Sequence, residues 1–274
     1  MNIAIFPNTD KCGVVDITHN TVRQLEELGA SAFLPDDIDF INCKKMSVNE
    51  LYKNCDIIIT IGGDGTLISH AKKASIYEKP VLGINAGRLG YLADVDKNEI
   101  DLLNKLISHN YTIDSRIMLN IDVYKNDNKI FSGTALNDVV VGSGGIARIS
   151  DINLSILDDD INYHADGIIL STPTGSTAYS MSAGGPIVEP SARCFIITPI
   201  CSHSMTARPL IVNQDNTIKL SVLDNDASTY LTVDGRDKIS INSECDIVVT
   251  KSIYEAKFIN LSGRTFYKTL SYKF

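Results

Sequence analysis

The sequence predicts an α/β N-terminal domain with a parallel sheet, followed by an all-β, sandwich-like C-terminal domain. Segments with strand and helix patterns alternate over roughly the first hundred residues, which is typical of a parallel sheet covered by helices. After about residue 116, the spacing of apolar residues changes from helical to every second residue. The chain has 274 residues, of which 44% are hydrophobic and 21% charged, so it can form two modest domains with sizeable cores.

The N-terminal elements follow from local patterns and capping residues. Apolar β-branched runs with glycine stops indicate buried strands, and apolar residues spaced three and four apart indicate helices. In a parallel sheet, ligands bind beyond the carboxyl ends of the strands. The expected elements are strands at 2–6, 56–61 and 80–85, helices at 16–28 and after the capping-box sequence 47–50, and a helix capped by Asp96 or Glu99.

A glycine turn that contains a carboxylate follows the isoleucine-rich strand. Residues 62–66 read Gly-Gly-Asp-Gly-Thr, and a helix pattern follows at 67–74. Strand, glycine turn and helix form a phosphate-binding layout, because glycines allow close approach and the free N–H groups at a helix start attract anions. A carboxylate beside phosphates is repulsive unless it holds a metal or takes a proton. Asp64 therefore indicates a site that carries out a reaction, and not simple phosphate binding. An ordinary strand-to-helix turn with an Asp cap is the alternative.

Two familiar nucleotide-binding patterns do not fit the sequence. The turn lacks the Lys-Ser/Thr pair that follows the second glycine of a P-loop. Residues 142–147 match the dinucleotide fingerprint G-x-G-x-x-A, but that fingerprint requires a helix next, and residues 148–157 have a strand pattern. We therefore expect a glycine-rich loop between strands there, in preference to a Rossmann motif.

The second half of the chain is expected to contain strands and no long helix between residues 200 and 260. Without a Pro- or Ser-rich linker, the two domains should pack closely and leave a ligand-binding cleft. The expected domains are residues 1–115, completed by about 255–274, and residues 116–254. The expected strands lie at 120–124, from Ile130 after a turn at 125–129, at 152–156 and at 218–222.

The composition restricts the partners and the compartment. The net charge of -8 and the pI of about 5.1, without a basic run, disfavour nucleic acid and anionic membranes as partners. No apolar run approaches the length of a membrane span and the N-terminus resembles a strand, so we expect a cytoplasmic protein. The six cysteines are scattered without a C-x-x-C pair, which indicates reduced thiols, and we expect no protein-held metal.

A second polar constellation lies between residues 163 and 190. Residues 172–180 read Thr-Pro-Thr-Gly-Ser-Thr-Ala-Tyr-Ser, and their small hydroxyl groups suit ribose, phosphate and carboxamide partners. Tyr179 has a ring that could stack on a base. Asn137-Asp138 is a further polar pair before an apolar strand. Taken separately, these segments are also compatible with ordinary turns.

Taken together, these motifs closely resemble the bacterial NAD kinases in order and spacing. A lipid kinase with the same glycine turn would show Gly-Thr-x-Asn-Asp after the next strand, where this chain has Asn-Ala-Gly-Arg at 85–88. The resemblance implies a two-domain fold and ATP-dependent phosphorylation of the adenosine ribose 2′-hydroxyl of NAD, giving NADP. The matching segments, which cover nearly the whole chain, are 62–66, 83–85, 87–92, 137–138, 172–180 and 233–235.

The resemblance also implies roles for individual residues. Asp64 matches the proton acceptor for the ribose hydroxyl, and the glycine turn would hold the phosphates of ATP with Mg²⁺. Asp166 matches an acid near the nicotinamide end. The residues implied to bind NAD or ATP are Gly62, Gly63, Gly65, Thr66, Tyr91, Asn137, Asp138, Arg148, His164, Asp166, Thr177, Ala178, Tyr179, Ser180, Ser182, Cys201 and Arg236.

Some alternatives stay open at this point. Many family members have Arg at the place of Ser69 and Gln at that of Arg236, so the phosphate donor (ATP or polyphosphate) and the nicotinamide contacts are not fixed. His164 is equally compatible with a solvated loop histidine. The family's homo-oligomers imply a dimer or tetramer. A catalytically silent NAD(H)-binding sensor, or a lipid or sugar kinase with the same turn, are the alternative functions.

Overall fold

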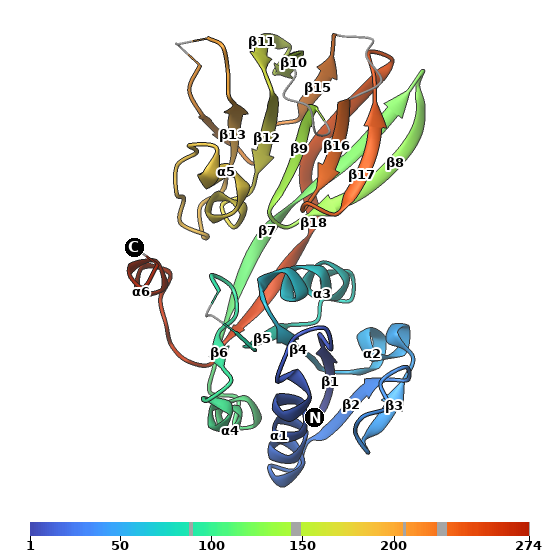
Figure 1. The fold of residues 1–274 in the computed structure, drawn as a ribbon, viewed down its shortest axis with the longest axis vertical. Coiled ribbons are helices and arrows are strands. Elements are labelled where there is room, and N and C mark those ends of the chain that lie inside the picture. Colours follow the sequence, from blue (N-terminus) through green and yellow to red (C-terminus); the bar gives the residue numbers. More distant parts are fainter. Residues whose placement is uncertain (88–89, 144–148, 205–206, 224–228, 274) are drawn as a thin grey trace. The chain divides into compact units, whose positions relative to one another are not determined.

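The computed structural model describes residues 1–87, 90–143, 149–204, 207–223 and 229–273. The chain divides into two units (Figure 1). Unit 1 comprises Met1–Ser115 and Tyr254–Phe274, and unit 2 comprises Arg116–Ile253. Two long strands, β7 (Thr112–Lys125) and β18 (Cys245–Asn260), cross the boundary between them. The predicted fold class is confirmed: unit 1 is α/β with a parallel sheet, and unit 2 is an antiparallel β unit.

Unit 1 has its strands in the order β18-β5-β4-β1-β2-β3, and every pairing among them is parallel. Its other elements are β1 (Asn2–Pro7), α1 (Val14–Glu27), β2 (Ser31–Pro35), β3 (Lys44–Met46), α2 (Val48–Asn54), β4 (Ile57–Gly62), α3 (Asp64–Ile76), β5 (Val81–Asn85), β6 (Val95–Asp96), a 3₁₀ helix (Ile100–Leu102), α4 (Leu103–Ile107) and α6 (Phe266–Ser271).

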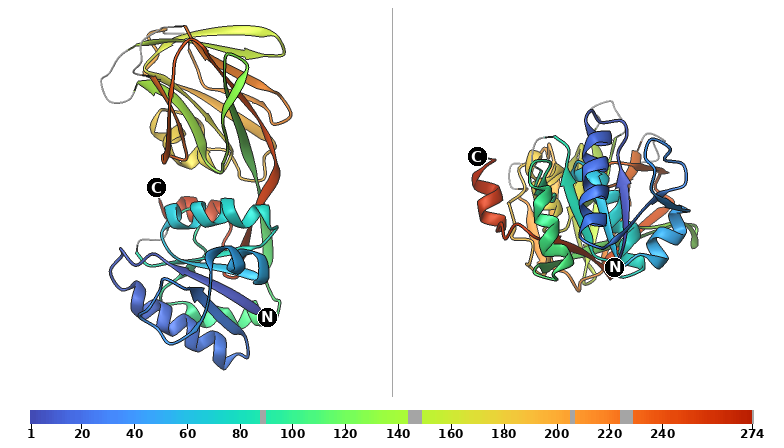
Figure 2. Two further views of the ribbon diagram at one scale, coloured as in Figure 1. Left: turned by 90° about the vertical axis from the view of Figure 1, so that its right-hand side faces the viewer. Right: turned by 90° about the horizontal axis from the view of Figure 1, so that it is seen from below.

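Helices cover both faces of this sheet, as the turned view in Figure 2 shows. Apolar residues of α1 and α4 join one buried cluster with alternate residues of β1 and β4, such as Ile5 and Ile59. On the opposite face, Phe6 of β1 stacks on Tyr52 of α2 and on His70 of α3, with ring centroids 5.1 and 4.3 Å apart. Because both faces are covered, β4 is buried along its whole length, as its isoleucines predicted.

Local sequence signals account for several element boundaries. The predicted capping box is confirmed: Ser47 Oγ accepts the N–H of Glu50, and Glu50 Oε2 accepts the N–H of Ser47 at 3.1 Å. The helix expected after Asp96 or Glu99 is a 3₁₀ turn followed by the five-residue α4. Glu99 does not cap that helix with its side chain, because its carboxylate pairs with Arg264 and accepts the N–H of Asp96.

Unit 2 contains a six-stranded antiparallel sheet in the order β14-β13-β12-β9-β16-β17, and a second set of antiparallel strands, β11-β10-β15-β18, with β7 and β8. Its elements are β8 (Asn128–Ala135), β9 (Asp138–Ser143), β10 (Ser150–Ile156), β11 (Asp159–Ala165), β12 (Gly167–Ser171), a 3₁₀ helix (Gly175–Thr177), α5 (Tyr179–Ser182), β13 (Cys194–Ile200), β14 (Leu210–Asn213), β15 (Ile218–Val222), β16 (Thr229–Val233) and β17 (Asp237–Ile241).

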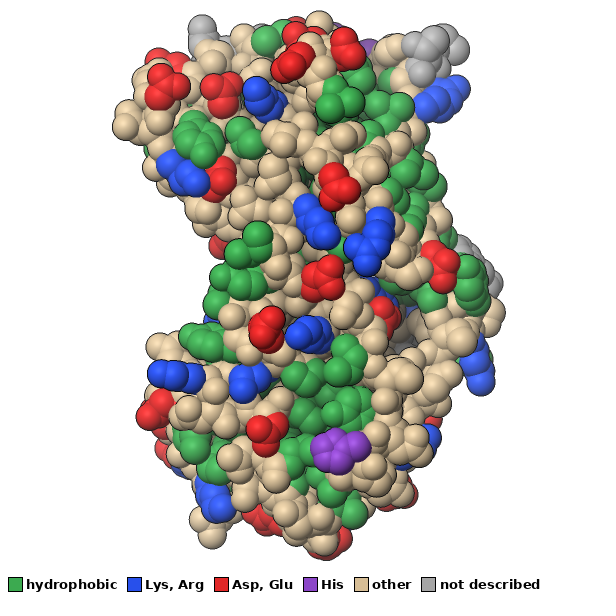
Figure 3. Space-filling view, turned by 180° about the vertical axis from the view of Figure 1, so that it is seen from behind, with side chains coloured by type: hydrophobic (Ala, Val, Ile, Leu, Met, Phe, Trp, Pro, Cys, Tyr) green, Lys and Arg blue, Asp and Glu red, His purple; other side chains and the backbone are tan. Residues whose placement is uncertain are grey.

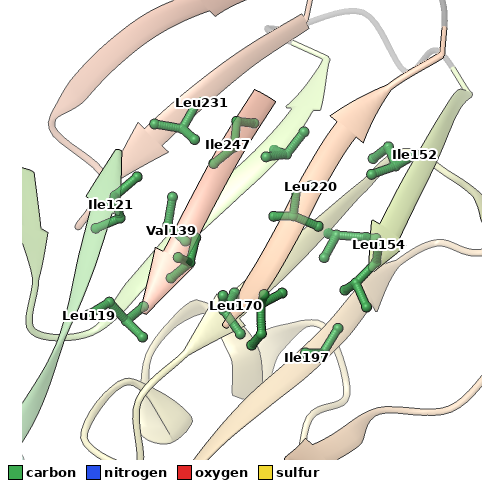
Figure 4. Close-up of a cluster of buried hydrophobic side chains, with 14 of the residues drawn as sticks. Leu119, Ile121, Val139, Ile152, Leu154, Leu170, Ile197, Leu220, Leu231 and Ile247 are labelled. Carbon is green, nitrogen blue, oxygen red and sulfur yellow. The ribbon is translucent and has the colours of Figure 1, made fainter. Parts of the chain in front are cut away.

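The core of unit 2 lies between these two sets of strands. Val139 and Leu170 of the six-stranded sheet belong to the same buried cluster as Leu154 and Leu220 of the other set, as Figure 4 shows. Burying each such side chain contributes about 1.5–3 kcal/mol. The glycine-rich segment after β9 leads to the strand β10, as predicted, although residues 144–148 themselves lie outside the described part of the chain.

The predicted turn at 125–129 joins β7 to β8. Asn126 and Asp127 both have positive φ angles, 48° and 64°, which is the geometry of a type I′ hairpin turn. On the face of the molecule drawn in Figure 3, Lys and Arg side chains lie interspersed with Asp and Glu side chains. Within the described ranges, no helix is long and apolar enough to cross a membrane.

Candidate active site

The glycine turn lies at the carboxyl end of β4, where α3 begins. Gly62 ends the strand, and its carbonyl oxygen accepts the N–H of Ala86, at 2.9 Å, from the end of the neighbouring strand β5. On the other side, the N–H of Asn8 donates to the carbonyl of Ile61 at 2.8 Å, and its side-chain amide donates to Thr66 Oγ1 at 2.9 Å. The ends of three parallel strands therefore meet around the turn, as expected for a ligand site in such a sheet.

Asp64 is the first residue of α3, and its carboxylate accepts three backbone hydrogen bonds. Oδ2 accepts the N–H of Tyr91 at 2.7 Å, and Oδ1 accepts those of Leu92 and Ala93, both at 3.3 Å. A Cβ on Gly90 would lie 2.1 Å from Oδ1, so only glycine permits this approach. A carboxylate has about four acceptor positions, so three donors fix its orientation and leave capacity for one more, such as a hydroxyl group.

Tyr91 is brought to the turn through its backbone. Its ring lies beside the ammonium of Lys273, with 5.2 Å from Nζ to the ring centroid. The contact between Asp64 and residues 91–93 joins segments about 27 residues apart, and local sequence patterns contain no signal for it.

One cationic side chain at the turn was not among the sequence-predicted residues. Lys11 lies in the loop between β1 and α1, and a Cβ on Gly63 would lie 2.5 Å from its Nζ. Lys11 could have been found from the expected topology, because loops that follow neighbouring parallel strands meet at the same edge of a sheet.

In unit 2, the predicted pair Asn137-Asp138 is held by Asp234. The Asp234 carboxylate accepts the N–H groups of Leu136, Asn137 and Asp138 at 3.1, 2.8 and 3.2 Å. Asp234 lies at the tip of the β16–β17 hairpin with a φ of 47°, and Gly235 next to it has a φ of 67°. The left-handed Asp-Gly pair thus turns the hairpin and points its carboxylate at β9.

Asp138 is 4% exposed. Burial disfavours the charged carboxylate and raises the pKa of Asp138 to about 7, and the nearby charge of Asp234 acts in the same direction. A carboxyl group with a pKa near neutrality can accept or donate a hydrogen bond to a polar ligand, and such groups are enriched at functional sites.

The Thr-Pro-Thr-Gly segment packs directly on the same pair. The N–H of Thr172 donates to the carbonyl of Asn137 at 2.9 Å, and its hydroxyl donates to the carbonyl of Leu136 at 2.6 Å. Thr172 Oγ1 in turn accepts the N–H of Gly175 at 3.1 Å. A Cβ on Gly175 would lie 2.1 Å from the backbone carbonyl oxygen of Asn137, so glycine is required for this close contact.

The residues that follow differ in accessibility. Tyr179 is 47% exposed at the start of α5, and Ser182 at its end is exposed. Ser180 is fully buried, and its hydroxyl pairs with that of Thr198 at 2.9 Å. Thr177 and Ala178 are half-buried, and Thr177 Oγ1 donates to the carbonyl of Thr174. Arg236 is exposed on the β16–β17 hairpin.

Three further predicted residues, His164, Asp166 and Cys201, form a second group at the opposite end of β12. Strand pairing places Ser171 opposite Asp138, and Gly167 opposite Gly142. The four residue steps from 171 to 167 correspond to about 13 Å. Asp166 precedes β12, and its N–H donates to the carbonyl of Ile200, immediately before the exposed Cys201.

His164 belongs to this second group. Its Nδ1 lies 2.6 Å from Asp151 Oδ1, and its ring meets that of His203 edge-on at 5.7 Å. It also lines a cavity of about 310 Å³ together with Tyr163 and Arg208. Arg148, another predicted residue, lies outside the described residues.

Comparison with known proteins gives the same family over both units. The model of the ATP-NAD kinase N-terminal domain matches residues 3–111, and that of the ATP-NAD kinase C-terminal domain matches residues 136–261. The NAD kinase of Acetivibrio thermocellus is 37% identical over 276 residues, which cover 98% of this chain and 96% of that protein. The NAD kinase of Carboxydothermus hydrogenoformans is 41% identical over 230 residues, with 82% and 81% covered.

Solved structures agree with this assignment. An NAD kinase from Archaeoglobus fulgidus in complex with ATP superposes with a TM-score of 0.78 at 25% identity, covering 100% of this chain and 98% of that chain. Yeast NADH kinase complexed with NADH has the same fold, with a TM-score of 0.86 at 24% identity, covering 99% of this chain and 85% of that chain. The chain belongs to the ATP-NAD kinase family.

Proposed function

We propose that this NAD kinase transfers the terminal phosphoryl group of ATP to the 2′-hydroxyl of the adenosine ribose of NAD, with Asp64 as the proton acceptor. The observation that carries the proposal is the carboxylate of Asp64, held by the amides of Tyr91, Leu92 and Ala93 within a glycine turn at a helix start. A merely structural turn does not need a carboxylate that retains acceptor capacity beside a phosphate-binding layout.

The chemistry requires such a group. A ribose hydroxyl is a poor nucleophile, and a positioned base that takes its proton is worth roughly 10²–10⁴ in rate. A bond forms between the ribose oxygen and the terminal phosphorus, the bond from that phosphorus to the oxygen of ADP breaks, and the hydroxyl proton passes to Asp64. The N-terminus of the 13-residue helix α3 favours the negative charge of the phosphates.

We propose that Mg²⁺ arrives with ATP. No group of three or more His, Cys, Asp or Glu residues in the described part of the chain is arranged to hold a metal. Mg²⁺ does not require such a group, because it commonly binds substrate phosphates, waters and only one or two carboxylates. The ion would offset the charge of the phosphates, while the chain orients them at the turn.

On the NAD side, we propose that Asp138 accepts a hydrogen bond from a ribose hydroxyl or the adenine amino group, and that Tyr179 stacks on the base. Asp166, Cys201 and His164 would then contact the nicotinamide half. In this proposal, residues 1–115 with 255–274 form the ATP-binding domain and residues 116–254 form the NAD-binding domain. The resemblance to the family further leads us to propose a homo-oligomer, a dimer or tetramer, which sedimentation would test.

The direct test is to incubate the pure protein with NAD, ATP and Mg²⁺ and to follow NADP with an NADP-specific dehydrogenase. That coupling enzyme reports the 2′-phosphate, so a signal identifies the site of phosphorylation as well as the reaction. We expect NADP and ADP in equal amounts, none without ATP, and NADP formation slowed roughly 10²–10⁴-fold in the Asp64→Asn variant. Absence of NADP, with NAD binding intact by calorimetry, would favour an NAD-binding sensor. Parallel reactions with NADH and with polyphosphate define the acceptor and the donor.

A further inference from the structure

The glycine turn contains no cation of its own. In a P-loop, the lysine that contacts the phosphates follows the second glycine directly, whereas residues 65–69 of this chain read Gly-Thr-Leu-Ile-Ser. Phosphoryl transfer nevertheless depends on positive groups that hold the triphosphate in place as charge develops. A cation supplied by another segment would therefore complete the turn.

The loop after β1 brings such a cation to the turn. β1 pairs in parallel with β4, with Pro7 opposite Ile61, so the residues that follow β1 lie next to those that follow β4. Asn8 ties the two segments together through its bonds to the Ile61 carbonyl and Thr66 Oγ1, and the N–H of Lys11 donates to the carbonyl of Asn8 at 3.1 Å. The position of the Lys11 backbone is thereby coupled to the turn.

The side chain of Lys11 ends on Gly63. A Cβ on that glycine would lie 2.5 Å from Nζ and 3.8 Å from Cε, so the ammonium occupies the space that a side chain there would fill. Lys11 is exposed, and its ammonium has no hydrogen-bond or ion-pair partner among the described residues. The carboxylate of the same turn, Asp64, is directed to the amides of residues 91–93.

We propose that Lys11 binds the triphosphate of ATP, and thus supplies from a neighbouring loop the charge that a P-loop carries within its glycine motif. Asn8 is then a positioning residue, because it fixes the loop through Thr66 and Ile61. The inference rests on the proposed function of the turn as the ATP phosphate site. It assigns Lys11 to the donor alone, so removing its charge affects ATP and not NAD.

The test compares Lys11→Met, which removes the charge and keeps the stem, with Lys11→Arg and with Lys53→Met, which changes an exposed lysine on α2. Hydrogen bonds to charged groups contribute about 1.5–3 kcal/mol, so we expect the dissociation constant and the KM for ATP to rise about 10- to 100-fold in Lys11→Met. The KM for NAD should stay at the parent value. Lys11→Arg should restore most of the ATP affinity, and Lys53→Met should match the parent.

A salt titration separates a charge contact from a structural effect. If Lys11 contacts the phosphates, ATP affinity measured by calorimetry without NAD falls more steeply with ionic strength in the parent than in Lys11→Met. Parent-like ATP affinity and salt dependence in Lys11→Met would overturn the assignment, while NADP formation by the parent would leave the proposed function standing. An equal loss of ATP and NAD affinity would also overturn it, because the assignment of Lys11 to the donor alone requires a loss for ATP and none for NAD. Asn8→Ala should weaken ATP binding in the same direction, but less.

Discussion

The carboxylate of Asp64 accepts a hydrogen bond from the backbone N–H of Tyr91 at 2.7 Å, so the proposed base is also an anchor for a distant segment. Replacing Asp64 with Asn removes the negative charge. The N–H donors of Tyr91, Leu92 and Ala93 then face an amide, whose oxygen is a weaker acceptor and whose NH₂ group accepts no hydrogen bond. We expect Asp64→Asn to lose roughly 10²–10⁴ in kcat and to keep its NAD affinity within several-fold. Steady-state kinetics and NAD calorimetry on one preparation measure both quantities.

A second aspartate provides the control for the anchoring role. Asp94 Oδ2 accepts the N–H groups of Leu261 and Ser262 at 2.6 and 3.0 Å. Like Asp64, it holds the backbone of a distant segment, but it has no proposed role in the reaction. Asp94→Asn should lower the thermal stability and reduce kcat far less than Asp64→Asn. Equal losses of kcat in the two variants would show that anchoring, and not proton transfer, explains the effect at Asp64.

The buried Asp138 predicts a pH dependence of stability. Its pKa rises from the ordinary 3.8 to about 7, chiefly by burial and then by the charge of Asp234. The folded state therefore holds a proton that the unfolded state has released, so this group's contribution is fully present below pH 3.8 and is lost as the pH rises through about 7. Urea midpoints between pH 4 and 8 should fall less steeply in Asp138→Asn than in the parent. Asp160→Asn, at an exposed position on β11, should keep the parent slope.

Tyr179 presents 47% of its surface at the start of α5, next to the segment that packs on Asn137. If its ring stacks on the base of NAD, Tyr179→Ala should lose about 1 kcal/mol of NAD affinity, or about fivefold in Kd. Tyr179→Phe retains the ring and should bind as the parent does. An unchanged Kd and KM for NAD in the Ala variant would remove Tyr179 from the site.

The alkylation rates of two exposed cysteines, Cys12 and Cys201, can test the proposed ATP and NAD sites separately. Cys12 follows Lys11 and lines a cavity of about 310 Å³ together with Ala86, whose N–H donates to Gly62, whereas Cys201 follows β13. We expect ATP to slow the alkylation of Cys12 and NAD to slow that of Cys201, measured residue by residue by mass spectrometry. Protection of Cys201 by ATP alone, or of Cys12 by NAD alone, would contradict the assignment of the substrates.

The parts of the fold that depend on local pattern were predictable. The isoleucines of β4, the glycine turn and the capping box at Ser47 each carry their own signal, and the structure contains the corresponding elements. The change to period-two alternation likewise predicted the antiparallel strands of unit 2. Family resemblance, and not periodicity, supplied the reaction and most of the residue roles.

The contacts that organise the candidate site were not predictable from local pattern. Asp64 meets residues 91–93, and Asp234 meets residues 136–138, only after the order and register of the strands are known. For the same reason, the sequence did not reveal that Asp138 and Asp166 lie at opposite ends of β12 and its partner strand. The sequence did not predict Lys11 as a site residue, because its neighbour in space, Gly63, lies about 50 residues away in the chain and has no side chain to recognise.

The long strand β18 has a consequence for the order in which the protein is made. It carries Phe258, which pairs with Val81 of β5, and it leads to Ile259 and Leu261 in the core of unit 1. Because synthesis proceeds from the N-terminus, all of unit 2 is synthesised before the sheet of unit 1 has its last strand, whereas domains usually fold in order from the N-terminus. The unit that is begun first is therefore completed last, because the core of unit 1 includes Ile259 and Leu261, which follow all of unit 2 (Arg116–Ile253) in the chain.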